Sequence, residues 1–284
     1  LFLGYQAESK FENITKLKDI GNETVIIHQF YDKPSFSFTY IIGDRKTKEV
    51  IILDSVFNKK NYEIPTHKIW GNYYYINNKL DTARALLQFC DQMKYKVKYL
   101  INSHIHIDHI TANMEIKKIR YIPSIIGNYP HTESDFKYKE GDMINISPQL
   151  GLKTVKTPGH TENCHSFVLS GINYKYLFTG DCLLNRGIGR TDLDSTHSPN
   201  QVKKNKEIMF QSLIKLVTEM EKDSIDDDNI FIFPAHDYEE LRYSNYRELK
   251  NNNQYIQLVK KFIESQDVSI KNMFINLFEK KKSH

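Results

Sequence analysis

Four side chains of the kinds that bind metal ions fall within six residues of this sequence, in the stretch His104-x-His106-x-Asp108-His109. The stretch follows residues 97–101, an apolar run that is typical of a β-strand. In an extended backbone alternate side chains point to the same side, so the imidazoles of His104 and His106 would face one way. A lone His-x-His could simply end a strand in solvent, but four such groups this close together favour a metal site.

Three further potential ligands lie downstream: His160, Asp181 and His236. Each follows an apolar run and stands behind a Pro or a Gly, in Thr-Pro-Gly-His160, Phe-Thr-Gly-Asp181 and Phe-Pro-Ala-His236. A single case could be an ordinary turn residue, because Asp after Gly is itself a turn signal. Three cases together with the histidine cluster predict one shared metal centre. Strand ends suit such a centre because a rigid strand fixes the ligands while the following loop leaves room for a substrate.

The elements that must position these residues can be read from hydrophobic periodicity. Short β-rich runs at residues 25–30, 36–42 and 50–53 predict an antiparallel opening to a sheet. Apolar residues at helical spacing predict a helix over 83–97 with Asp81 as its N-cap, and a second helix from about Thr111. The second half repeats this order, with strands at 150–157, 166–169, 174–179 and 230–233, and helices at 202–221 and 256–263. This alternation predicts an α/β or α+β fold, with which a four-layer αββα sandwich is compatible.

Composition excludes several classes of protein. With 284 residues, the chain is expected to form one large domain, or one domain with an appendage. The net charge of +4 from 39 basic and 35 acidic residues is too small to predict nucleic-acid binding. No apolar run approaches the roughly 18 to 20 residues of a membrane span. Three cysteines far apart in the sequence do not suggest a disulfide scaffold.

The complete ligand series resembles that of the metallo-β-lactamase superfamily, over about residues 25–240. The resemblance implies an α+β fold, the αββα four-layer sandwich, with metals at one edge of its two sheets. It also implies two metal positions. One would use His104, His106, His160 and Asp181, and the other would use Asp108, His109 and His236, with Asp181 bridging.

Within the superfamily, three segments are similar to the persulfide dioxygenases. Residues 180–192 resemble their Gly-Asp-x-Leu-Leu-x-Arg-Gly-x-Gly-Arg-Thr-Asp signature, residues 158–164 their Pro-Gly-His-Thr-x-x-Cys, and residues 234–238 their Pro-Ala-His-Asp-Tyr. Glyoxalase II proteins are near relatives of that family but usually lack the Arg-Thr-Asp ending. Ile107, in place of a small residue, and a polar insertion at residues 57–78 depart from the family pattern.

The dioxygenase resemblance implies one Fe(II) per chain, held by His104, His160 and Asp181. The substrates would be glutathione persulfide and O2, and the products sulfite and glutathione. His106, Asp108, His109 and His236 would then orient the ligands. The alternative is a glyoxalase II-type thioester hydrolase (hydroxyacylglutathione hydrolase), in which the same seven residues hold Zn(II) or a mixed binuclear site. Every ligand for either enzyme is present, so the sequence leaves both open.

Residues near the ligands have less specific expectations. Arg190 either forms an ion pair that fixes the loop after Asp181 or binds a carboxylate of the thiol substrate. Arg186 is expected to be structural. Cys164 and Cys182 are expected to pack in the interior rather than to bind metal. Asp54 ends the third strand, where it could orient His109 or cap a turn.

The chain is expected to divide into a catalytic domain at residues 1–240 and a C-terminal helical appendage at 241–284, packed on the same domain. It begins at Leu1 without a Met, so we expect the start of the gene product to be missing. Family resemblance implies a mitochondrial location, otherwise a cytoplasmic one, and a role in sulfide detoxification. It also allows a homodimer. No nucleic acid or membrane partner is expected.

Overall fold

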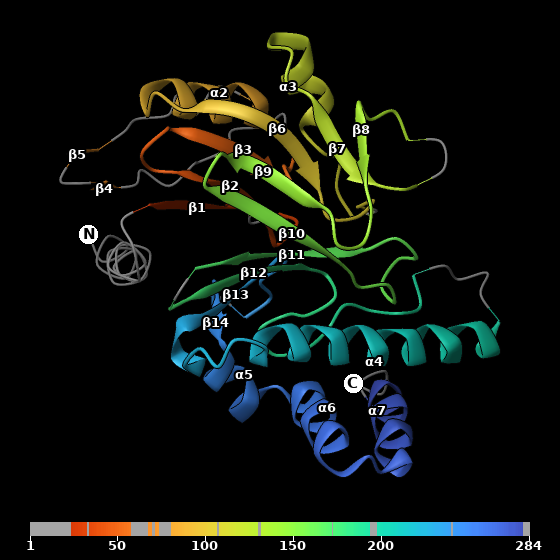
Figure 1. The fold of residues 1–284 in the computed structure, drawn as a ribbon. Helices are drawn as coiled ribbons and strands as arrows, with labels where there is room; N and C mark the ends of the chain where they lie inside the picture. Colours follow the sequence, from red (N-terminus) through yellow and green to blue (C-terminus); the bar gives the residue numbers. More distant parts are fainter. Residues whose placement is uncertain are drawn as a thin grey trace, which may run out of the picture.

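Two six-stranded sheets lie face to face in the computed structural model, with helices on their outer faces (Figure 1). The structure describes residues 24–32, 34–57, 68–69, 72–73, 81–106, 108–129, 132–171, 173–193, 198–239 and 241–280. Ile107 and most of the expected insertion at 57–78 lie outside these residues. Of the insertion, the structure describes Phe57 and a two-stranded pair, β4 (Lys68–Ile69) and β5 (Asn72–Tyr73).

The first sheet has the order β1-β2-β3-β6-β7-β8. Its strands are β1 (Val25–Asp32), β2 (Ser37–Asp44), β3 (Glu49–Leu53), β6 (Lys96–Asn102), β7 (Ser124–Gly127) and β8 (Phe136–Tyr138). The pairs β1/β2 and β2/β3 are antiparallel, which confirms the expected opening of the sheet. From β3 onward the pairs are parallel, so β3 and β6 end at the same edge of the sheet.

The second sheet has the order β14-β13-β12-β11-β10-β9. Its strands are β9 (Met143–Ser147), β10 (Leu150–Lys156), β11 (His165–Ser170), β12 (Lys175–Gly180), β13 (Ile230–Pro234) and β14 (Ser244–Asn245). The central pair β12/β13 is parallel and the other pairs are antiparallel. The second sheet therefore also brings the carboxyl ends of two neighbouring strands to one edge.

Helices complete the outer layers. The first sheet is covered by α2 (Thr82–Gln92) and α3 (Asn113–Ile119), and the second by α4 (Pro199–Glu221) and the C-terminal helices α5 (Tyr246–Asn252), α6 (Gln254–Ser265) and α7 (Val268–Lys280). A 3-10 turn, η1 (Asp227–Asn229), precedes β13. Asp81 is the N-cap of α2, as expected, and accepts a hydrogen bond from Arg84 N. The helix expected over 83–97 ends at Gln92, because Lys94 adopts a left-handed conformation (φ 57°) and β6 begins at Lys96. No helix among the described residues is both long and apolar enough to span a membrane.

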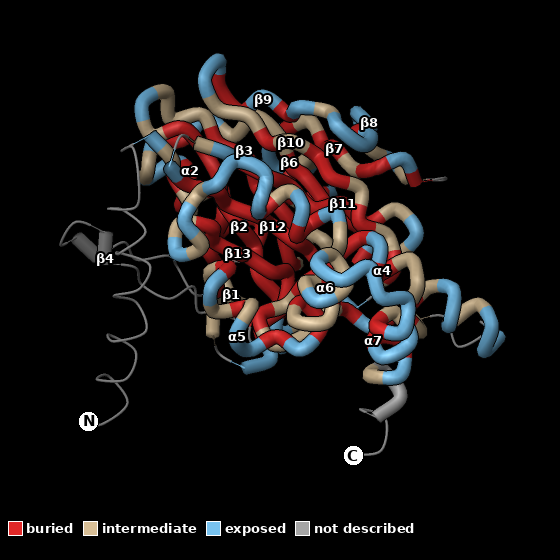
Figure 2. Tube along the Cα trace, turned by 60° about the horizontal axis from the view of Figure 1, so that its bottom comes forward, coloured by how far each residue is buried: buried red, intermediate tan, exposed pale blue. Residues whose placement is uncertain are grey.

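Three buried apolar clusters correspond to the three contacts between layers. On β2, Phe38, Tyr40 and Ile42 enter the cluster between the two sheets, whereas Ile41 enters the cluster beneath α2. This period-two alternation is what a strand buried on both faces requires. A third cluster joins β12 and β13 to α4 and the C-terminal helices. Figure 2 shows the buried strands enclosed by exposed helix surfaces. The expected α+β class and αββα layering are confirmed.

Candidate metal centre

All the expected ligands meet at one edge of the two sheets. His104 and His106 follow β6, Asp181 directly follows β12, and His236 follows β13. His160 lies in the loop that joins β10 to β11. The strand β6 ends at Asn102, so the His-x-His lies just beyond the strand rather than within it. Its two rings nevertheless lie side by side, with centroids 4.1 Å apart, as the alternation argument predicts.

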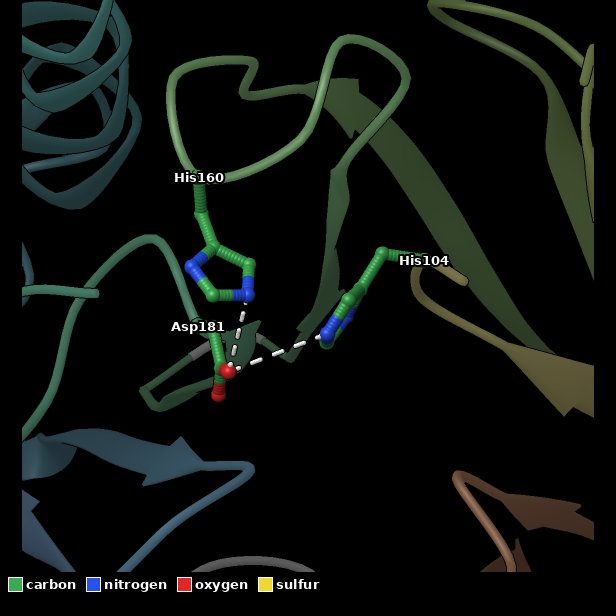
Figure 3. Close-up of side chains that lie close together, drawn as sticks. All are labelled: His104, His160 and Asp181. Carbon is green, nitrogen blue, oxygen red and sulfur yellow. Dashed lines mark ion pairs between the residues drawn. The ribbon is translucent and has the colours of Figure 1, made fainter. Parts of the chain in front are cut away.

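His104, His160 and Asp181 form what we call the first ligand group. Their potential ligand atoms all lie within 4.8 Å of one another. The Nε2 atoms of His160 and His104 lie 3.2 and 3.7 Å from the same carboxylate oxygen, Oδ2 of Asp181. Figure 3 shows the two imidazoles approaching this carboxylate from different loops. The arrangement offers two nitrogens and one oxygen to a single point.

Hydrogen bonds on the far side of each ring fix the tautomers. His160 Nδ1 lies 2.9 Å from the carbonyl oxygen of Arg190, so Nδ1 must donate and Nε2 carries the lone pair. His104 Nδ1 lies 2.9 Å from Ser103 Oγ. That hydroxyl donates its own proton to Asp54 Oδ2 at 2.7 Å, so it accepts from His104. His104 Nε2 is buried without a hydrogen-bond partner. Two imidazole lone pairs and one carboxylate directed at one point fit a divalent metal such as Fe(II).

Asp54 organises this side of the site. It follows β3 in a left-handed backbone conformation (φ 52°) and is buried. Its carboxylate accepts from Ser103 N at 2.7 Å and from His106 Nε2 at 3.1 Å. Burial alone would raise the pKa of Asp54, but His106 and His104 hold this pKa below its ordinary value. The histidine partner of Asp54 is His106 rather than the expected His109, because parallel pairing of β3 with β6 brings its carboxylate to His106 and Ser103.

His106, Asp108 and His109 form a second ligand group, whose potential ligand atoms also lie within 4.8 Å of one another. The rings of His106 and His109 stack with centroids 4.4 Å apart. Because His106 donates from Nε2 to Asp54, its Nδ1 is the nitrogen left for a metal, and Nδ1 is buried without a partner. Asp108 is exposed, in contrast to the buried Asp181. This group can hold a second metal ion.

His236 lies between the two groups. Its Nδ1 is 2.6 Å from Asp181 Oδ1, and its Nε2 is 2.7 Å from Asp108 Oδ2 and 3.0 Å from Ser37 Oγ. Burial would lower the pKa of His236, but the two carboxylates outweigh burial and raise it to about 10. The same contacts hold the pKa of Asp108 below its ordinary range. His236 therefore bridges Asp181 and Asp108.

The loop after Asp181 folds back over the first ligand group. Gly189 donates its N–H to the carbonyl oxygen of Asp181 at 2.8 Å. A Cβ at Gly189 would lie 2.0 Å from that oxygen and 3.0 Å from His160 Nδ1, so only glycine fits there. Arg190 supplies the carbonyl that holds His160, and its Nε lies 3.1 Å from Asp192 Oδ1. The ion pair within the loop is thus present, and the Arg190 side chain remains 63% exposed.

A cavity of about 520 Å³ opens beside the first ligand group. His160, Asp181 and Arg190 line it, together with apolar residues of the loop and with Tyr238. The ring of Tyr238 stacks on His236 with centroids 5.5 Å apart. Such a cavity has the size of a small-molecule site.

Some residues around the site have the contacts that the sequence predicts, and others were not predicted to belong to the site. Arg186 forms an ion pair with Glu248, in line with a structural role. Cys182 is buried with Sγ 3.7 Å from Met209 Sδ, and Cys164 Sγ accepts from Thr161 N, so both thiols pack as expected. Sequence reasoning missed Ser103, Ser37 and Asn185. Ser103 stands beside His104, but nothing local shows that its hydroxyl links His104 to Asp54.

The family model of the metallo-beta-lactamase superfamily matches residues 33–236. The chain therefore belongs to the metallo-β-lactamase superfamily.

Among curated proteins, "Persulfide dioxygenase ETHE1, mitochondrial" of Bos taurus is 28% identical over 237 residues, covering 82% of this chain and 77% of the relative. "Hydroxyacylglutathione hydrolase" of Polaromonas sp. is 25% identical over 220 residues, covering 76% of this chain and 68% of the relative. Among solved structures, ETHE1 from Myxococcus xanthus has a TM-score of 0.61 at 23% identity, covering 84% of this chain and 91% of that chain. The structural likeness shows the shared fold.

Proposed function

We propose that this protein is an iron-dependent persulfide dioxygenase that converts glutathione persulfide and O2 to sulfite and glutathione. The sulfur–sulfur bond breaks, the terminal sulfur takes both oxygen atoms of O2, and water supplies the third oxygen of sulfite. The glutathione sulfur leaves as a thiol. Bound Fe(II) would supply coordination positions for the persulfide sulfur and O2, together with the redox chemistry that joins them.

One observation carries the proposal: His104, His160 and Asp181 present two imidazole lone pairs and a carboxylate within 4.8 Å of one another. Two histidines and one carboxylate are the ligand set of many non-haem iron oxygenases, because three coordination positions stay open. The resemblance at residues 180–192 and 234–238 supports this reaction. The names of the curated relatives from Bos taurus and Mus musculus support it as well.

Residues around the proposed ligands would prepare the site rather than react. Ser103 and Arg190 hold the imidazoles of His104 and His160 in the tautomers that leave Nε2 free. His236 would fix Asp181, Asp108 would hold His236, and His106 and His109 would shape the site around them. The exposed guanidinium of Arg190 would bind a carboxylate of the thiol substrate at the rim of the cavity.

Metal analysis and an oxygen electrode test this function. Protein purified anaerobically should hold about one iron per chain and little zinc. Given glutathione persulfide, it should consume O2 and release sulfite in equal amounts. Two zinc ions per chain, without O2 uptake, would refute the dioxygenase.

A second candidate is the glyoxalase II-type thioester hydrolase with a binuclear site. The observation that favours it is the second ligand group, which gathers His106, Asp108 and His109 within 4.8 Å. A second metal would help to generate the hydroxide that attacks a thioester. Release of glutathione from S-lactoylglutathione without O2 uptake would select this function.

The remaining assignments are proposals of the same kind. The name "mitochondrial" in the relatives supports a mitochondrial location. We propose residues 241–284 as a helical appendage of the catalytic domain, since Tyr255, Ile256 and Phe274 share one buried cluster with α4. A homodimer is also proposed. Size-exclusion chromatography with light scattering tests it.

A further inference from the structure

The turn at residues 184–187 forms part of the wall of the cavity beside His160 and Asp181. Leu184 donates its N–H to the carbonyl oxygen of Gly187 at 3.0 Å, which places Asn185 and Arg186 at the tip of the turn. The carbonyl oxygens of Leu184 and Gly187 both accept from Nδ2 of Asn253, at 3.1 and 3.0 Å. Asn253 is fully buried where α5 meets α6. The C-terminal helices therefore hold the backbone of this turn.

A second anchor holds the tip of the turn itself. The guanidinium of Arg186 forms an ion pair with Glu248 on α5. This contact occupies Arg186 in a structural role. The turn is thus fixed on both sides. The contacts of Leu184, Gly187 and Arg186 set the position of the remaining tip residue, Asn185.

Asn185 is buried, with 4% of its surface exposed, yet neither its Oδ1 nor its Nδ2 has a hydrogen-bond partner. Among the described residues it is the only side chain with two such atoms. Burying an amide without partners costs stability, so an unpaired amide in a cavity wall needs an explanation. A ligand that pairs with both atoms supplies one. Rotation of the Asn185 side chain toward the cavity would break no hydrogen bond, because its amide group makes none.

We propose that Asn185 recognises a secondary amide of the thiol carrier, accepting from the amide N–H through Oδ1 and donating to the amide C=O through Nδ2. The proposal rests on the proposed function, in which the carrier's sulfur lies at His160 and Asp181. Leu184 and Ile188 line the same cavity, and apolar surroundings strengthen such hydrogen bonds. Arg190 stands on the same wall and suits a carboxylate, which favours a peptide thiol over an uncharged amide thiol.

Calorimetric titration of the protein with S-methylglutathione tests the subsite without turnover, since the methyl group blocks the thiol. Replacing Asn185 with Leu removes two neutral hydrogen bonds, so the affinity should fall roughly 10- to 100-fold. The affinity for S-methylcysteine, which has no peptide amide, should be the same in both proteins. S-methylpantetheine, which has amides but no carboxylate, should bind less tightly than S-methylglutathione.

Asn145→Leu is the matched control, because Asn145 is exposed on β9, outside the cavity lining. Asn145→Leu should bind S-methylglutathione as the wild type does. Asn185→Leu should unfold at the same temperature as the wild type or higher, because it removes two unpaired buried groups. If Asn185→Leu does not fold, Asn185→Ala replaces it, with the same expected loss of affinity.

Equal S-methylglutathione affinity in the Asn185 variant and the wild type would overturn the proposal. So would an equal loss for S-methylcysteine, or no binding of S-methylglutathione by the wild type. Tighter binding of S-methylpantetheine than of S-methylglutathione would overturn the assignment of a peptide thiol as the carrier. An Asn185-dependent affinity in a protein that consumes no O2 with glutathione persulfide would keep the subsite and reject the proposed reaction.

Discussion

The two ligand groups at the sheet edge differ in how firmly their side chains are held before any metal binds. In the first group, Nδ1 of His104 is held by the adjacent Ser103 hydroxyl, Nδ1 of His160 is held by the Arg190 carbonyl of a neighbouring loop, and Asp181 is buried. In the second group, Asp108 is exposed. Both carboxylates contact His236, so this contact does not distinguish the groups. A metal at the first group meets prepared lone pairs on a buried carboxylate and two fixed imidazoles, whereas a metal at the second must order an exposed carboxylate. Seven similar ligands therefore need not make two equal sites.

Deleting a ligand of the first group tests this comparison most strongly. His160→Ala should abolish iron binding, because a site with three ligands does not hold Fe(II) tightly with two. His104→Ala and Asp181→Ala should do the same. Elemental analysis of anaerobically purified protein measures the effect, with circular dichroism to show that each variant folds. Retention of a full equivalent of iron by His160→Ala would place the metal elsewhere.

The next largest effect should come from Asp54, which touches no proposed iron ligand directly. In Asp54→Asn the remaining oxygen can still accept from Ser103 N and His106 Nε2, but the amide NH2 that replaces Oδ2 cannot accept from Ser103 Oγ. Freed from Asp54, the Ser103 hydroxyl can donate to His104 Nδ1, which would move the ring proton to Nε2 and block the ligand atom. Iron affinity should fall about 10- to 100-fold, measured by competition with a chelator.

Asp44→Asn is the control for Asp54→Asn. Asp44 is also a buried carboxylate at a strand end, accepts from Ser147 Oγ at 2.6 Å, and lies at the opposite end of β2 from Ser37. It should lose stability and keep its iron affinity. Equal loss of iron affinity in both variants would show a general effect of destabilisation.

Much of this metal centre can be predicted from the sequence. Periodicity places the strands, and ligands that follow strands must meet where parallel neighbours end, so the edge and the ligand set are predictable from His104, Asp181 and His236. The hydrogen-bond partners of the buried polar side chains around the ligands are not predictable. Asp54 bonds His106 rather than His109 because of the register of β3 against β6, and this register is set by the packing of distant residues. The unpaired amide of Asn185 likewise depends on Asn253, far along the chain.

A smaller effect is expected in the loop that covers the first group. Gly189→Ala would push a methyl group into the carbonyl oxygen of Asp181, 2.0 Å away, whereas Gly187→Ala meets nothing within 4 Å. We expect Gly189→Ala to lose about 1–3 kcal/mol of unfolding free energy and to hold iron several-fold less tightly. Gly187→Ala should be near wild type in both. Urea unfolding and chelator competition give the two quantities, and similar behaviour of the two variants would contradict the close approach.

The smallest change in iron content, and the sharpest test between the two groups, is expected from Asp108→Ala. Removing Asp108 leaves His104, His160 and Asp181 with their hydrogen bonds intact, so iron should stay near one equivalent per chain. Activity should fall about 10- to 100-fold, because His236 loses its ion pair with Asp108 and keeps only the one with Asp181. Iron content and O2 uptake, measured on the same preparation beside His160→Ala, give the comparison. If Asp108→Ala lost metal as completely as His160→Ala, the second group would be an equal partner in metal binding, and the binuclear hydrolase would become the better reading of the site.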